Sequence, residues 1–98
     1  MRWTWDADKS RSNERDHGLD FETAALVFED EFAVTTPDPH PDGNRLRTVG
    51  RIGIVTLFVV HTWPQFDEDA GEEVGRIISA RKATPRERKK YEEEEKRG

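Results

Sequence analysis

The sequence predicts an α+β fold, in which a small, twisted, mainly antiparallel sheet has helices packed against it. Segments that alternate polar and apolar residues, as strands do, stand between segments with helical periodicity. Short links between most of the strands favour antiparallel pairing. Because the chain has 98 residues, we expect one domain spanning residues 1–98 with a single small core.

The N-terminal part of the chain is predicted to form a strand followed by a helix. Residues 2–5 alternate, and Asp6 can cap a helix that runs from Ala7 to about His17. Gly18 suits the left-handed position after that helix. The helix is nearly all polar, so its ends must hold it to the core.

A second helix is predicted over residues 21–30, with Asp20 as its cap. Its apolar face would consist of Phe21, Ala24, Ala25 and Phe28. We expect the apolar residues that flank the first helix to pin it against this core, namely Trp3, Trp5 and Leu19.

The rest of the chain is predicted to contain four strands and a last helix. The strands are 31–36, 45–50, 54–62 and 74–82, with 54–62 central because it is apolar on both faces. Prolines and an Asp-Gly pair predict a loop at 37–44, and acidic residues predict another at 64–73. The helix covers 84–97, and we expect its charged tail, about 92–98, to fray.

The composition limits where the protein can work. There is no cysteine, which excludes disulfides and thiolate metal sites. The longest apolar run, "IVTLFVV", is far too short to cross a bilayer, and the opening residues lack the apolar core of a signal peptide. We therefore expect a cytoplasmic protein that does not enter a membrane.

The net charge of −5 conceals charges that occur in blocks. Residues 19–44 hold seven acids and no Lys or Arg, and residues 67–75 hold five acids. Residues 76–91, in contrast, hold seven basic residues and one acid. Because electrostatic attraction is local in salt water, this basic stretch could bind a polyanion although the whole molecule is acidic. A merely solvated helix surface is the alternative.

The basic stretch runs from a strand into a helix. Regular alternation would place Ile77, Ser79 and Arg81 on one face, and Arg76, Ile78, Ala80 and Lys82 on the other. The strand ends before Thr84-Pro85, so Arg81, Lys82 and Arg86 can still gather around the helix N-terminus. Such a cluster could hold phosphates.

Glu87 has two interpretations. Thr84-Pro85-Arg86-Glu87 fits a capping box, in which Glu87 accepts a hydrogen bond from the Thr84 backbone. Alternatively, Glu87 is a general base or orients a nearby arginine. The two roles can coexist.

Two further side chains are candidates for proton transfer. His61, at the end of the central strand, could exchange a proton with a ribose 2′-hydroxyl, or could simply be hydrogen-bonded to the backbone. Tyr91 could act as an acid or anchor the last helix on the sheet. No histidine or acidic motif has the spacing of a metal site, so we predict neither a metal nor another cofactor.

With these residues in view, the chain resembles the BrnT family, ribonuclease toxins of bacterial type II toxin–antitoxin systems. The resemblance rests on "WTWDADKSRSNERDHGLDFETAALVFED" and on "VVHT" followed by "RIISARKATPRERKKYE", and it extends from about Trp3 to Tyr91. The resemblance implies a compact RelE-like fold. It also implies cleavage of RNA that inhibits translation.

The resemblance gives the basic residues a role. In a RelE-like enzyme, a 2′-hydroxyl attacks the adjacent phosphorus without a metal, a base accepts its proton, and arginines stabilise the growing charge. The catalytic positions implied are His61, Arg76, Arg81 and Glu87. The RNA-binding positions expected beside them are Lys82, Arg86 and Lys90. Which residue is the base stays open.

The resemblance also implies partners. A BrnA-like antitoxin with a ribbon-helix-helix part would neutralise the toxin, and the toxin would meet DNA only through that complex. The antitoxin could cover the basic stretch or bind the acidic region 20–44; the sequence leaves both possible. The chain departs from the family's pattern in the link from Thr62 to Arg76, which is long and acidic, and in Asp16, where lysine is usual.

Three hypotheses follow from the sequence. The first is a metal-independent endoribonuclease toxin. The second is a catalytically inactive RNA- or partner-binding module with the same fold. The third is a structural subunit that needs a partner in order to fold.

Overall fold

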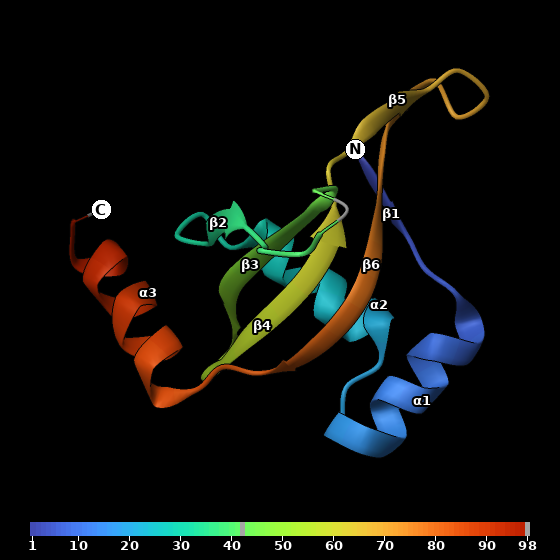
Figure 1. Ribbon diagram of the computed structural model, residues 1–98. Coiled ribbons are helices and arrows are strands. Elements are labelled where there is room, and N and C mark those ends of the chain that lie inside the picture. Colours follow the sequence, from blue (N-terminus) through green and yellow to red (C-terminus); the bar gives the residue numbers. More distant parts are fainter. Residues whose placement is uncertain (42, 98) are drawn as a thin grey trace.

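The computed structural model describes residues 1–41 and 43–97, so Asp42 of the predicted Asp-Gly turn and Gly98 of the predicted tail lie outside it. The α+β prediction is confirmed (Figure 1). The strands are β1 (Arg2–Thr4), β2 (Val34–Pro37), β3 (Arg45–Ile52), β4 (Val55–Thr62), β5 (Gln65–Asp67) and β6 (Glu72–Lys82). The helices are α1 (Ala7–His17), α2 (Phe21–Ala24), the 3₁₀ helix η1 (Ala25–Glu29) and α3 (Pro85–Arg97).

The strands form one mixed sheet in the order β1-β6-β4-β3-β2, and β5 pairs with the first part of β6. As predicted, β4 is central and most pairs are antiparallel. The exception is β1, which runs parallel to β6. This arrangement is compatible with a small RelE-like fold.

The first two helices begin where the sequence predicts. The Asp6 carboxylate accepts hydrogen bonds from the N–H groups of Asp8 and Lys9, and Gly18 follows α1 in the left-handed conformation with φ of 72°. The Asp20 carboxylate caps α2 through the N–H of Thr23 at 2.7 Å. No helix among the described residues is long and apolar enough to cross a membrane.

The predicted second helix changes its winding after one turn. It continues from Ala25 as a 3₁₀ helix, which has three residues per turn. Phe21, Ala24 and Val27 therefore share one face and are buried in the core. Ala25 and Phe28, which were also predicted for the apolar face, are partly buried and pack against this core, where Phe28 stacks on Trp3.

Two predicted boundaries are wrong. Strand β2 begins at Val34 rather than at residue 31, because the Asp30 carboxylate and carbonyl accept hydrogen bonds from the N–H groups of Phe32 and Ala33 and form a turn there. The predicted acidic loop 64–73 is mostly a hairpin, because β5 pairs with β6 from Glu72 onward.

Strand β6 contains a β-bulge that changes its alternation. Ser79 pairs with Val60 and Ile77 pairs with His61, so Ile78 is an additional residue without a partner. Ile77 and Ala80 consequently point to the same face and are both buried. The regular alternation predicted for this strand is therefore wrong, and Arg76 lies on the same face as Ser79 and Arg81.

The core lies on the face of the sheet that α2 and η1 cover, here called the covered face. At its centre are Phe21, Ala24, Val27, Leu57, Val59, Ile77 and Ala80. The polar α1 is fixed beside β6 by Asn13, which bonds both the N–H and the carbonyl of Ala80. Predicted anchors Trp3, Trp5 and Leu19 do pack against this core.

His61 belongs to the covered face and is only 2% exposed. Its Nε2 lies 2.6 Å from the Thr48 hydroxyl, and its Nδ1 lies 3.0 Å from the carbonyl oxygen of Thr62. The rings of Trp3 and Phe28 contact it edge-on. Burial lowers the pKa of His61, and the hydrogen bond to the Thr62 carbonyl offsets only part of that effect.

Gly75 allows β1 to lie close to β6. The ring of Trp3 covers Gly75 so closely that a Cβ atom there would lie 2.3 Å from Cζ3 of the indole. The indole cannot easily move away, because it stacks on Phe28 with 3.8 Å between ring centroids. A side chain at position 75 would therefore displace the aromatic groups that enclose His61.

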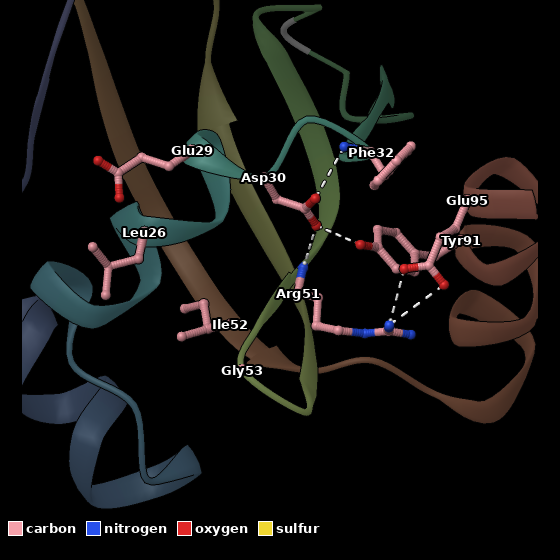
Figure 2. A pocket seen from close by; sticks show the side chains of 9 residues that line it. All are labelled: Leu26, Glu29, Asp30, Phe32, Arg51, Ile52, Gly53, Tyr91 and Glu95. Atoms are coloured by element: carbon pink, nitrogen blue, oxygen red, sulfur yellow. Dashed lines mark hydrogen bonds and ion pairs between the residues drawn. The ribbon is translucent and has the colours of Figure 1, made fainter. Parts of the chain in front are cut away.

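Helix α3 lies away from the other helices (Figure 1). Figure 2 shows how it is anchored: the Tyr91 hydroxyl donates to the Asp30 carboxylate, which also accepts the N–H of Arg51 at 2.8 Å. The Arg51 guanidinium lies 5.0 Å from the centre of the Tyr91 ring and pairs with Glu95. Burial would raise the pKa of Asp30, but these hydrogen bonds outweigh it and the pKa is lowered.

Replacing Gly75 with alanine should destabilise the protein. The added Cβ overlaps the indole of Trp3, and such overpacking costs about 1–3 kcal/mol. Ser79→Ala, at an exposed position of the same strand, is the control and should change the free energy of unfolding by less than about 0.5 kcal/mol. Denaturant titration measures both; equal stability of the two variants would contradict the close contact.

Acid should destabilise the protein through His61. The unfolded chain takes up a proton at the usual pKa near 6.5, whereas the folded chain does so only at lower pH. The free energy of unfolding should therefore fall as the pH drops below about 6.5. His61→Phe should flatten this slope, whereas His17→Asn, at an exposed position, should keep it. An unchanged slope in His61→Phe would refute the assignment.

Candidate functional site

The second face of the sheet is rich in cations and is here called the open face. Its side chains alternate with those of the covered face along three strands. They include Arg45, Arg47, Val49, Phe58, Val60, Thr62, Arg76, Ser79 and Arg81. Arg76 and Ser79 are exposed, and most of the others are half-buried. A row of guanidinium groups therefore faces solvent on a rigid sheet.

Arg81 is held in place from three sides. Its guanidinium carbon lies 4.0 Å from the centre of the Phe58 ring. Its Nη1 donates to Oε1 of Glu87 at 2.8 Å and to the Lys82 carbonyl at 3.2 Å, and its Nη2 donates to Oε2 of Glu87 at 3.0 Å. Three of its N–H groups are thus used. Within residues 1–41 and 43–97 the Nε–H and the second Nη2–H have no acceptor, and because they lie side by side they can bind two oxygens of one anion.

Glu87 connects Arg81 to the start of α3. The predicted capping box is present, since Oε1 of Glu87 accepts the N–H of Thr84 at 2.8 Å and the Thr84 hydroxyl accepts the N–H of Glu87 at 3.2 Å. The hydrogen bonds from Arg81 lower the pKa of Glu87 although its partial burial opposes them. Glu87 also raises the pKa of Arg81. Glu87 is therefore an ionised carboxylate that orients an arginine, as one sequence-based interpretation predicted.

A hollow of about 260 Å³ lies between this pair and β2. Arg47, Phe58 and Glu87 line it together with Arg86 and Lys90 of α3. The guanidinium carbon of Arg47 lies 5.9 Å from the centre of the Phe58 ring. The hollow thus combines an aromatic ring, several cations and one carboxylate.

The structure separates other predicted site residues from this hollow. Arg76 is on the open face but five residues before Arg81 in β6, where its N–H donates to the Thr62 hydroxyl. Lys82 is the β-sheet partner of Leu57, whose side chain lies on the covered face. The side chain of Lys82 therefore leaves the strand on the covered face, although it is exposed to solvent.

Two further candidates also lie apart from Arg81. His61 lies on the covered face, and both of its ring nitrogens have hydrogen-bond partners. The structure therefore does not bring His61 to Arg81. Tyr91 anchors α3 through Asp30, and burial together with that carboxylate raises the pKa of its hydroxyl.

Some residues of this site were missed by the sequence reasoning. Phe58 and Arg47 were not among the predicted site residues, because the sequence placed them only within the predicted strands 54–62 and 45–50. The sequence did contain a signal for this face. Arg45 and Arg47 stand two positions apart, and therefore on one face of their strand, beside a central strand that is apolar on both faces. Within residues 1–41 and 43–97, no three His, Asp or Glu side chains gather where they could hold a metal ion.

Comparisons with known proteins identify the family. A family model described as the ribonuclease toxin, BrnT, of type II toxin–antitoxin systems matches residues 5–87. A comparison with curated protein sequences gave no match. The matched region begins just after β1 and contains all strands from β2 to β6 and the Arg81–Glu87 pair. The chain therefore belongs to the BrnT family of ribonuclease toxins, whose place in type II systems implies an antitoxin partner.

Proposed function

We propose that this protein is a metal-independent endoribonuclease that binds single-stranded RNA across the open face and cleaves it beside Arg81. The observation that carries the proposal is the fixed guanidinium of Arg81, whose partners Glu87 and Phe58 line a hollow together with several cations. A guanidinium edge of this kind fits two oxygens of a phosphate. Membership of a ribonuclease family supplies the reaction class.

In the proposed reaction, the ribose 2′-oxygen attacks the adjacent phosphorus and the 5′-oxygen of the next nucleotide leaves. The leaving 5′-oxygen takes a proton from water, so the products are a 2′,3′-cyclic phosphate and a 5′-hydroxyl end. Arg81 stabilises the negative charge that grows on the phosphate oxygens. Because its donors are already oriented by Glu87 and Phe58, little reorganisation is needed during the reaction.

Glu87 is the proposed proton acceptor. Its Oε1 already accepts two hydrogen bonds, from Arg81 and Thr84, whereas Oε2 accepts one from Arg81. Oε2 therefore keeps a lone pair for the 2′-hydroxyl proton. The lowered pKa makes Glu87 a weak base, but it also keeps the carboxylate ionised at neutral pH.

Arg86 and Lys90 are proposed to hold the RNA backbone, because both line the hollow beside Arg81. Lys82 would contact RNA only at the rim, since its side chain begins on the other side of the strand. His61 enters this scheme as a support of the sheet, because it is enclosed by Trp3 and Phe28.

The antitoxin partner is proposed to be BrnA-like, with a ribbon-helix-helix part through which the complex meets DNA. Its acidic segments would be attracted to the open face, where RNA also binds. The antitoxin would then inhibit the toxin by occupying the substrate's surface.

Purified protein should cleave single-stranded RNA in the presence of EDTA, and Arg81→Ala should lower the rate by about 10²- to 10³-fold. Arg88→Ala is the matched control, because Arg88 is an exposed arginine of α3 that pairs only with Glu92 among the described residues. RNA with 2′-O-methyl groups should resist cleavage, since it lacks the nucleophile. Gel analysis of the ends measures all three; tight binding without new ends would favour an inactive RNA-binding module instead.

Glu87→Gln should lower kcat by about 100-fold if Glu87 accepts the proton. The wild-type rate should stay level from about pH 7 to about pH 5, because the lowered pKa keeps Glu87 ionised there. Single-turnover rates across this range test both statements. A Glu87→Gln rate close to that of wild type would leave Glu87 with only the role of orienting Arg81.

A further inference from the structure

A second part of the open face has the features of a nucleotide subsite. Two adjoining hollows of about 220 and 230 Å³ lie near the end of β4, away from α3. Both are lined by Asn44, Thr62 and Arg76. Arg76 lies five residues before Arg81 in β6, which corresponds to roughly 16 Å at about 3.3 Å per residue.

Trp63 borders this region and is 53% exposed. The two other tryptophans, Trp3 and Trp5, pack against the core. Trp63 directly follows β4, so the rigid central strand fixes the position of its backbone. Exposed aromatic side chains next to cations are the usual platform on which unpaired bases stack.

Cations converge on the same place. Arg76 is exposed, and among the described residues no carboxylate lies within ion-pair distance of its guanidinium. Lys9 and Arg45 line the adjoining hollow. The nearby carboxylate is that of Asp6, whose pKa is lowered first by its hydrogen bond from Lys9 and to a smaller extent by Arg76. Asp6 is already used as the cap of α1.

The hairpin beyond Trp63 limits where a polyanion can lie. Strand β5 ends at Asp67, the turn contains Glu68 and Asp69, and β6 begins with Glu72 and Glu73. These carboxylates repel phosphates, so an RNA strand that follows the open face from Arg81 should end its contacts near Trp63. The surface thus has one catalytic end and one end formed by an aromatic ring and an arginine.

We propose that Trp63 and Arg76 form a second RNA subsite, in which the indole stacks on an unpaired base and the guanidinium binds the adjoining phosphate. The proposal rests on the proposed function in that the ligand is the same RNA strand that Arg81 cleaves. It adds a specificity element, because a stacking platform requires a flexible, unpaired nucleotide at a fixed distance from the cleaved bond. Double-stranded RNA, whose bases are already stacked, would not fit.

The test is binding of a fluorescent 2′-O-methyl oligonucleotide, which cannot be cleaved, measured by anisotropy. Trp63→Ala should weaken binding by about 5- to 100-fold, the usual effect of losing one stacked base. Trp63→Phe should restore most of the affinity. Phe66→Ala is the matched control, because Phe66 is an exposed aromatic of the same hairpin that lines neither hollow. Its affinity should equal that of wild type.

Two further arms separate stacking from other causes. Replacing the bases of the oligonucleotide one at a time by abasic sites should reveal a position at which wild type and Trp63→Ala bind equally. Arg76→Ala should reduce the slope of log affinity against log salt by about 1, whereas Trp63→Ala should leave it unchanged. Melting curves of each variant check that it is folded.

The outcomes distinguish this inference from the proposed cleavage. If wild type cleaves RNA through Arg81 but Trp63→Ala binds as wild type does, only the subsite is overturned. If Trp63→Ala weakens binding in the expected base-dependent way while wild type does not cleave RNA, the subsite stands and the proposed nuclease reaction fails. Equal losses in Trp63→Ala and Phe66→Ala would also overturn the subsite.

Discussion

The additional residue at Ile78 in β6 determines which side chains of that strand reach the core and which reach solvent. Without the bulge, regular alternation would place Arg76 and Arg81 on opposite faces of the sheet. With it, Ile77 and Ala80 both enter the core, while both arginines share the open face. A bulge of this kind disrupts one step of the hydrogen-bond ladder, and here β4 accommodates it between Val60 and His61. The length of the cationic surface, from α3 to the end of β4, depends on this irregularity.

Local signals in the sequence predicted the elements whose ends are fixed by a single side chain. Asp6, Gly18 and Asp20 each act within a few residues of the chain, so their roles can be recognised without knowing the fold. The capping box of Thr84 and Glu87 is another such case. The parallel pairing of β1 with β6 joins residues that are more than seventy positions apart, and it depends on the contact of Trp3 with Gly75. No local pattern contains that contact, which is why the sequence alone does not reveal that the packing requires a glycine at position 75.

The residues of the candidate site likewise divide into those that a local sequence pattern predicts and those that depend on distant contacts. Arg81, Arg86 and Glu87 are close in sequence, so a strand end followed by a helix start could be predicted to gather them. Phe58 could not be placed, because a central strand that is apolar on both faces does not reveal which face is covered. His61 was a plausible proton carrier for the same reason: it ends a strand, and only the packing of Trp3 and Phe28 shows that it is enclosed.

The acidic balance of the chain is compatible with a cationic face because several carboxylates are committed to structural roles. Asp6 and Asp20 cap helices, Asp30 holds α3 through Tyr91, and Glu87 orients Arg81, and the pKa of each is lowered below its usual value. Among these carboxylates Glu87 pairs with Arg81, and Asp6 lies near Arg76. Most of the acidic residues of the β5–β6 hairpin lie beyond Trp63, at the far end of the open face. Since electrostatic interactions in salt water extend only about 8–10 Å, a phosphate near Arg81 responds to the local guanidinium groups rather than to the net charge. The distribution of charge along the sheet, and not its sum, therefore determines where a polyanion can bind and where its contacts must end.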